Sequence, residues 1–294
     1  MTPEQETDPR VLELYDEYCH GGIDRREFLR RAALITVAGA SALALAQAML
    51  PRYARAQTIS FTDERIKATY VSYPSRRGLS GKMRGYLVQP TGAGPFPAVI
   101  VFHENRGLNP YIEDVARRAA VAGFLALAPD ALAPVGGYPG NDDDGRTLQA
   151  KLDPKKLRQD MINSARYLQK HALSSGKLGA VGFCWGGGMV NQLAVALGAD
   201  LHAAVPFYGA AAADADVPKI KAPLLIQYAA NDPRINAMWP QFEAALKASD
   251  VRYTMHMYEN TNHGFHNNST PRYDAAAAKL AWDRTIAFYR AEQT

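Results

Sequence analysis

Cysteine is scarce in this chain, with two residues in 294, and the sequence contains no Lys/Arg block, no aromatic pattern of an RNA-binding domain and no zinc-finger spacing. Two cysteines exclude a scaffold built on disulfides. The basic excess is small, 33 Lys and Arg against 29 Asp and Glu, so nucleic acid is not expected as a partner. Because 47% of the residues are hydrophobic, the composition is that of a globular protein with a packed core.

Phosphate-binding and metal-binding motifs are missing as well. The run Gly186-Gly187-Gly188 is followed by neither the lysine of a P-loop nor the glycine spacing of a dinucleotide-binding fold. The seven histidines are scattered, and the pair His263 and His266 has no nearby glutamate to complete a ligand set. We therefore expect no cofactor and no metal ion.

The N-terminal segment has the features of an export signal. Arg25 and Arg26 precede a weakly apolar run over residues 32–50, and Ala54-Arg55-Ala56 places small residues where a signal peptidase cleaves. This pattern predicts a twin-arginine signal that engages the twin-arginine export machinery, with cleavage after Ala56. We expect residues 1–56 to be a signal with an N-terminal extension and residues 57–294 to be an exported, periplasmic domain.

A membrane anchor is the alternative interpretation of the same segment, because about 19 apolar residues can just span a bilayer. The polar or small residues within the run make it a poor span; they are Thr36, Gly39, Ser41 and Gln47. If the segment is not cleaved, the chain would be membrane-anchored. If it is cleaved, Cys184 becomes the single thiol of the mature chain.

Beyond residue 57, runs rich in β-branched residues alternate with helical patterns, and no repeat interrupts them. Alternation of this kind predicts one α/β domain, a mostly parallel sheet with helices on both faces. Strands are expected over residues 66–73, 81–89, 97–103, 124–128, 177–183, 203–208, 223–229 and 253–258, the first two as an antiparallel pair. Helices are expected over residues 112–122, 153–171, 186–196, 240–248 and 274–290.

The strongest chemical pattern is Gly182-Phe183-Cys184-Trp185-Gly186-Gly187, where a strand ends and a helix begins. It has the spacing of a nucleophile elbow with sulfur in place of oxygen, since small residues on both sides permit the strained turn. The turn places Cys184 at a helix N-terminus, which favours the thiolate. A glycine-rich turn that merely packs a cysteine is the structural alternative.

Asp232 and His263 follow two later strands, beyond the carboxyl end of each. The order nucleophile, acid, histidine is that of α/β-hydrolase triads, and catalytic groups of open α/β sheets gather at this edge. His263 is expected to move a proton and Asp232 to orient it. Taken singly, each is as readily explained as a loop residue.

The loop after the strand 97–103 reads His103-Glu104-Asn105-Arg106-Gly107. A loop at this position donates one oxyanion-hole amide in α/β-hydrolases, and the residue after the nucleophile donates the other. We expect Asn105 and Trp185 in these roles. Glu104 is expected beside Cys184, where it would manage the proton of the thiol, or else on the surface, and His103 is expected to support the loop.

These four segments, residues 103–108, 182–187, 230–232 and 262–265, resemble the dienelactone hydrolase family of α/β-hydrolases, which is carboxymethylenebutenolidase-like. The resemblance covers the chain from about residue 66 to 288. It implies a Cys184-His263-Asp232 triad that cleaves lactones or small carboxylic esters through a thioester. It also implies a resting thiol that stays protonated beside Glu104 until substrate binds.

One departure concerns the substrate. Dienelactone-cleaving members carry an arginine shortly after the catalytic histidine, whereas here the stretch 265–269 has none and Arg272 is the first arginine. Dienelactone itself is therefore not expected. Residues 131–146 are expected to form a lid or rim loop. Substrate contacts are expected from Arg106, Arg146, Tyr208 and Arg234.

Two other functions compete with an ester or lactone hydrolase. One is a family member without turnover that binds a ligand or partner. The other is a thiol redox sensor, which cleavage after Ala56 would leave without a resolving cysteine. The sequence does not determine the oligomeric state.

Overall fold

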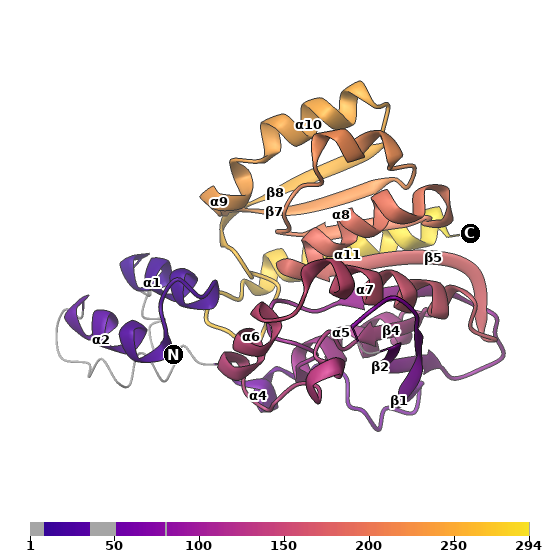
Figure 1. Cartoon of the computed structure of the whole chain (residues 1–294), viewed down its shortest axis with the longest axis horizontal. Helices are drawn as coiled ribbons and strands as arrows, with labels where there is room; N and C mark the ends of the chain where they lie inside the picture. The colour runs from indigo at the N-terminus through magenta and orange to yellow at the C-terminus, as the bar shows by residue number, and fades with distance from the viewer. Residues whose placement is uncertain (1–8, 36–50, 80, 294) are drawn as a thin grey trace.

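The computed structural model describes residues 9–35, 51–79 and 81–293, and they fold around one eight-stranded sheet of order β1-β2-β4-β3-β5-β6-β7-β8 (Figure 1). The pairs β1/β2 and β2/β4 are antiparallel, and the remaining pairs are parallel. The prediction of an α/β-hydrolase fold with a mostly parallel sheet is confirmed. The strands are β1 (Ile66–Ser75), β2 (Gly81–Pro90), β3 (Phe96–Phe102), β4 (Leu125–Pro129), β5 (Ser174–Phe183), β6 (Ala203–Phe207), β7 (Leu224–Asn231) and β8 (Tyr253–Asn262).

Helices cover both faces of the sheet, because its central strands are apolar on both sides. In β3, Ala98, Ile100 and Phe102 pack into one core, while Val99 and Val101 pack into the other. The first core is closed by helices α7 (Pro154–Gln169), α8 (Trp185–Leu197) and α10 (Trp239–Ala248). The second is closed by α5 (Pro110–Val121) and α11 (Ala275–Glu292).

Side-chain caps fix where several helices begin. Asn109 accepts a hydrogen bond from the backbone of α5, Asp153 from α7 and Asp274 from α11. Each cap satisfies backbone N–H groups that have no partner within the helix. Proline follows Asn109 and Asp153 directly, at a position where its missing N–H costs nothing.

The segment expected to be a lid or rim loop contains a helix. A short 3₁₀ turn, η1 (Ala133–Val135), is followed by α6 (Asp142–Ala150), which Asn141 caps by accepting from the Asp144 N–H. Three aspartates in the first turn of α6 interact favourably with the positive end of the helix dipole. Acidic residues at these positions are typical of a helix start. Two further 3₁₀ turns, η2 (Gly198–Asp200) and η3 (Asp214–Lys219), and the short helix α9 (Pro233–Asn236) complete the domain.

Two N-terminal helices, α1 (Pro9–Cys19) and α2 (Arg25–Ile35), lie beside the domain near α6 and α9 (Figure 1). Their buried residues form a small core of their own, consisting of Val11, Tyr15, Tyr18, Cys19, Phe28 and Ala32. The helix α4 (Tyr53–Ala56) precedes the predicted mature domain. In the part of the chain that the structure describes, no helix has the length and apolar character needed to cross a membrane. Residues 36–50 of the predicted export run lie outside the described residues.

Candidate active site

The turn between β5 and α8 places Cys184 above the end of the sheet with a strained backbone. Cys184 has φ 55° and ψ −113°, a conformation that L-residues rarely adopt and that is typical of functional turns. The flanking glycines are required by close backbone contacts. A Cβ on Gly182 would lie 2.1 Å from the Gly186 carbonyl oxygen, and one on Gly186 would lie 2.5 Å from the carbonyl oxygens of Phe102 and His103. The segment therefore has the geometry of a nucleophile elbow.

His263 and Asp232 meet at the same edge of the sheet. Asp232 follows β7 and caps α9, and His263 follows β8. The His263 Nδ1 lies 2.5 Å from the Asp232 Oδ2, and both side chains are 3% exposed. The Nε2 of His263 is buried and makes no hydrogen bond to any residue that the structure describes. The carboxylate thus orients the ring and leaves its second nitrogen free for another group.

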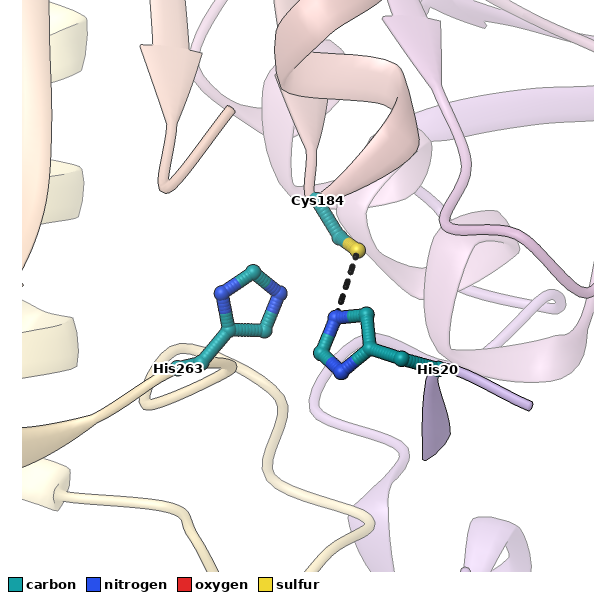
Figure 2. Close-up of side chains that lie close together, drawn as sticks. All are labelled: His20, Cys184 and His263. Carbon is teal, nitrogen blue, oxygen red and sulfur yellow. Dashed lines mark hydrogen bonds between the residues drawn. The ribbon is translucent and has the colours of Figure 1, made fainter. Parts of the chain in front are cut away.

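The side chain of Cys184 faces two imidazoles, those of His20 and His263 (Figure 2). The Sγ of Cys184 is 3.9 Å from the Nε2 of His20, and the side-chain atoms that the three residues offer as ligands all lie within 4.8 Å of one another. Burial raises the pKa of the thiol, but the neighbouring His263 outweighs it and holds the pKa well below its usual value. Burial lowers the pKa of His263, but the neighbouring sulfur and Asp232 raise it overall. The site therefore favours a thiolate and an imidazolium.

Glu104 lies at the same site and is buried. Its Oε2 accepts a hydrogen bond of 3.0 Å from the Asn267 side chain. Burial raises the pKa of this carboxyl group, and the charge of Cys184 adds to the rise, whereas Arg106 and Arg272 oppose it. A carboxyl group with a raised pKa next to a thiol with a lowered one is a suitable pair for sharing a proton.

His103 holds the loop that carries Glu104. Its Nε2 accepts from the Ala131 N–H at 3.1 Å, and its Nδ1 lies 2.5 Å from the Glu104 carbonyl oxygen. Burial lowers the pKa of His103, so the ring is neutral and donates through Nδ1. The Trp185 ring stacks on it with centroids 5.3 Å apart. The side chain of Asn105 donates to the Cys19 carbonyl oxygen at 3.1 Å.

The four residues expected to contact substrate have different surroundings. Arg106 is buried and forms an ion pair of 2.8 Å with Asp142 of α6. Tyr208 is buried against the His263 ring, with centroids 4.9 Å apart and its hydroxyl unpartnered among the described residues. Arg146 and Arg234 both contact the N-terminal segment, as described below. Their role toward substrate stays a prediction.

Three residues at the site were not expected from the sequence, namely His20, Asn267 and Arg272. Arg272 follows His263 at a distance along the chain, and nothing in the sequence indicated that it lies at the site. The loop folds back, so that a Cβ on Gly264, next to His263, would lie 3.1 Å from the Arg272 Nη2. Arg272 is buried and contributes to the pKa of Glu104. For His20 no signal was available, because the segment that carries it was assigned to export.

A metal ion would need the lone pairs of His20, Cys184 and His263, the one group of three potential ligands among the described residues. Zinc accepts this ligand type. However, Arg234 Nη2 lies 2.8 Å from the His20 Nε2, so this lone pair already accepts a hydrogen bond and a cation would be placed against a guanidinium. The expectation that no metal takes part stays a prediction.

A cavity of about 350 Å³ reaches Cys184. Its wall includes Trp185, Tyr208, Ile235, Asn105 and His20. A cysteine on a strained strand-to-helix turn, a buried His–Asp pair and a cavity at the carboxyl edge of a parallel sheet together define an α/β-hydrolase.

Comparison with known proteins specifies the family. The model of the dienelactone hydrolase family matches residues 83–293, which is most of the chain, and the chain belongs to this family. It is therefore a hydrolase of the dienelactone hydrolase type. A second family model, described as YqhI-like, matches residues 2–37.

Individual relatives agree with this assignment. YghX of Escherichia coli strain K12, a candidate hydrolase fragment, is 61% identical over 39% of this chain and 97% of its own. A probable 2-oxo-3-(5-oxofuran-2-ylidene)propanoate lactonase of Bradyrhizobium is 31% identical over 72% of this chain and 91% of its own. The structure of a candidate dienelactone hydrolase from Klebsiella pneumoniae superposes with a TM-score of 0.68 at 28% identity, covering 76% of this chain and 98% of its own.

Proposed function

We propose that this protein cleaves a lactone or a small carboxylic ester through a Cys184-His263-Asp232 triad and a thioester acyl-enzyme. The observation that carries the proposal is the position of His263, which is bound to Asp232 through Nδ1 and buried beside the strained Cys184 with Nε2 free. The cavity at Cys184 is of a size suited to a small substrate.

In the acylation step the Cys184 thiolate attacks the acyl carbon, forming a C–S bond and placing the carbonyl electrons on oxygen. Backbone amides of Asn105 and Trp185 would hold this oxyanion. Collapse of the intermediate breaks the acyl C–O bond, and the leaving oxygen takes the proton of the His263 imidazolium. For a lactone the leaving oxygen stays tethered, so the acyl-enzyme carries a free hydroxyl group.

In the deacylation step His263 takes a proton from water as the water attacks the thioester carbon. The C–S bond then breaks, releasing a carboxylic acid and restoring the thiolate. Asp232 stabilises the imidazolium in both steps without itself being protonated. Glu104 tunes the resting thiol, since its raised pKa lets the carboxyl group hold a proton while Cys184 rests as the thiolate until substrate binds.

A lactone is the favoured substrate class. The Bradyrhizobium relative is named for a furanone-type lactone, and the family is named for dienelactone. A tethered leaving group fits a cavity of about 350 Å³ better than an acid and an alcohol that must be accommodated separately. Arg272 and Arg106 lie near Glu104, but each is already paired with a carboxylate, Asp16 and Asp142 respectively.

The decisive experiment compares Cys184→Ala with Cys19→Ala in the full chain. Cys19 is buried in the N-terminal core and lines neither cavity of the site. We expect Cys184→Ala to abolish turnover of p-nitrophenyl acetate and of small lactones, and Cys19→Ala to retain both. Intact-mass spectrometry during turnover should show one acyl group on Cys184. Retained turnover in the Cys184→Ala variant would refute the mechanism.

We also infer that the chain is exported through the twin-arginine route. Arg25 and Arg26 are exposed at the start of α2, where an export receptor can bind them. The inference rests on the sequence pattern of residues 24–56, and its test is given in the Discussion.

A further inference from the structure

The turn that follows α1 enters the candidate active site. Residues 20–24, which begin with His20, connect α1 to α2. The His20 ring lies 4.8 Å from the His263 ring between centroids, at an interplanar angle of 72°. Its Nε2 lies 3.9 Å from the Sγ of Cys184 (Figure 2). A residue 164 positions away in the chain therefore faces the proposed nucleophile.

Charged and polar contacts hold this turn in place from several sides. Arg272 forms an ion pair of 2.8 Å with Asp16, and Arg234 donates to His20 at 2.8 Å. Arg146 donates to the Tyr18 carbonyl oxygen and stacks over the Tyr18 ring. These arginines come from three separate loops or helices of the domain, so the docking of the segment is specified at several points.

Further contacts come from α1 itself and from the loop of Asn105. The Tyr18 hydroxyl donates to Asp143 of α6 at 2.5 Å, and Asn105 donates to the Cys19 carbonyl oxygen. Tyr15 and Tyr18 also pack against Phe28 in the core that α1 and α2 share. The buried residues of the two sheet cores lie between Ile66 and Tyr289, so the two-helix unit docks on a domain whose cores are complete.

The turn divides the space in front of Cys184. On one side is the cavity of about 350 Å³ that contains Cys184. On the other side a cavity of about 700 Å³ extends along α6 and the start of α7. His20, Asn105 and Trp185 line both cavities and so form the partition between them. Of these three, His20 alone belongs to the N-terminal segment.

The hydrogen bonds of His20 are consistent with a residue that lines the cavity and do not leave it free to transfer a proton. Its Nδ1 lies 2.9 Å from the Asp16 carbonyl oxygen and must donate to it. A guanidinium can only donate, so the Arg234 contact at 2.8 Å requires an unprotonated Nε2. Against the effect of burial, Asp16 and Cys184 raise the pKa of His20 to about 10, but an N–H on Nε2 cannot face the Arg234 N–H at 2.8 Å. In this contact His20 is therefore neutral.

We propose that His20 is a specificity-determining residue, which closes the substrate cavity around Cys184 and restricts the enzyme to small acyl groups. The statement about substrate rests on the proposed function. Removing the imidazole would join the two cavities and admit a long acyl chain toward α6 and α7.

His20 can close the cavity only in a chain that keeps its N-terminal segment. Cleavage after Ala56 would remove His20, so the cut and uncut forms should accept acyl chains of different length. Ala56 is the last residue of α4 and is buried, and its carbonyl oxygen accepts from Asn268 at 2.7 Å. A peptidase would have to unfold this helix before cutting there.

The first test measures acyl-chain selectivity in the full chain. In His20→Ala we expect the kcat/KM for p-nitrophenyl octanoate, relative to the acetate, to rise about tenfold or more, because a wall in an apolar pocket discriminates by this order. His20→Gln keeps most of the volume and should retain the preference of the parent. Arg30→Ala is the matched control, since Arg30 is exposed and pairs with Glu27 within α2.

The second test needs no turnover, so it separates failure of this proposal from failure of the proposed function. Alkylation at Cys184, followed by peptide mass spectrometry, is compared for iodoacetamide and for fluorescein maleimide. His20→Ala should accelerate the bulky reagent about tenfold and leave the small one nearly unchanged. Equal selectivity in His20→Ala and the parent, in either test, overturns the proposal. An equal rise in the rates with both substrates or both reagents also overturns it, because His20 would then only block access to Cys184. An equal loss of both rates overturns it as well, because it indicates a catalytic histidine.

Discussion

Cys184 and His263 have pKa values displaced in opposite directions, and the cause lies in their immediate neighbours. Asp232 stabilises the imidazolium of His263, and that imidazolium in turn lowers the pKa of Cys184. Both groups are therefore charged over a range of pH that extends below the pKa of a free thiol and above that of a free imidazole. An ordinary thiol with a pKa of about 8.5 is mostly protonated at neutral pH.

The pH dependence of Cys184 alkylation follows from this pair. Because the pKa of the folded thiol is lowered, the iodoacetamide rate should stay on its plateau as the pH falls through 8.5 and decline only at lower pH. In the chain unfolded by denaturant, the rate should halve near pH 8.5. If the alkylation rate of the folded protein depends on pH in the same way as that of the unfolded chain, the thiolate–imidazolium pair of Cys184 and His263 is contradicted.

Asp232→Asn tests the orientation of His263. The amide cannot stabilise an imidazolium and allows the wrong tautomer, so kcat should fall by about 10²–10⁴-fold while KM changes little. The pH midpoint of Cys184 alkylation should move upward in the same variant, because the imidazolium that lowers the thiol pKa is weakened. Loss of activity with an unmoved midpoint would indicate a structural defect instead. Melting temperature and circular dichroism serve as controls.

The elbow between β5 and α8 depends on backbone contacts that side chains cannot enter. Gly186 lies against two carbonyl oxygens of the β3 end, whereas a Cβ on Gly188, two residues later in the same helix, would lie 3.5 Å from the Ala210 Cβ and backbone N. The same substitution in one helix is therefore expected to have opposite effects at the two positions.

Gly186→Ala should destabilise the fold by more than about 2 kcal/mol, because β3 and α8 must separate to relieve the clash. Gly188→Ala should be neutral or stabilising by up to about 1 kcal/mol, since alanine is the better helix former. Chemical denaturation of both variants measures the difference in the free energy of unfolding. Equal stability of the two variants would contradict the packing described for the elbow.

Over the whole chain, the N-terminal segment carries two features at once, an arginine pair typical of export and a histidine that faces Cys184. The YqhI-like match covers residues 2–37, and the hydrolase match begins at residue 83. α1 and α2 share a core and are held on the domain by arginines. The proposed export signal is therefore also part of the folded structure.

The export proposal is tested by replacing Arg25 and Arg26 with lysine. Both side chains are exposed, so the fold should survive and the charge is kept, yet twin-arginine recognition should fail. In a bacterium with an intact twin-arginine system, we expect the variant protein to remain in the cytoplasm. Arg30→Lys with Arg31→Lys is the matched control and should be exported. Unchanged distribution of the first variant would refute the route, and the mass of the exported protein reports whether residues 1–56 are removed.

The amino-acid sequence was sufficient to predict the mostly parallel sheet, the succession of its strands along the chain and the elbow. These features have local signatures, namely apolar runs, capping residues and glycines at fixed spacing, and parallel strands bring their carboxyl ends to one edge whatever the loops do. The proximity of Asp232 and His263 could be expected for the same reason. The helix α6 was missed because three aspartates indicate a solvated turn as readily as a helix start.

The fold in three dimensions alone determined what surrounds that edge. The contact of His20 with Cys184 joins residues 164 positions apart and depends on arginines from separate loops, so no spacing or periodicity along the chain indicates it. Arg272 reaches Glu104 only because the loop after His263 folds back. Such contacts form when complete helices, strands and loops pack against one another. The charge and shape of their side chains determine this packing, whereas the local sequence pattern determines only the helices and strands themselves.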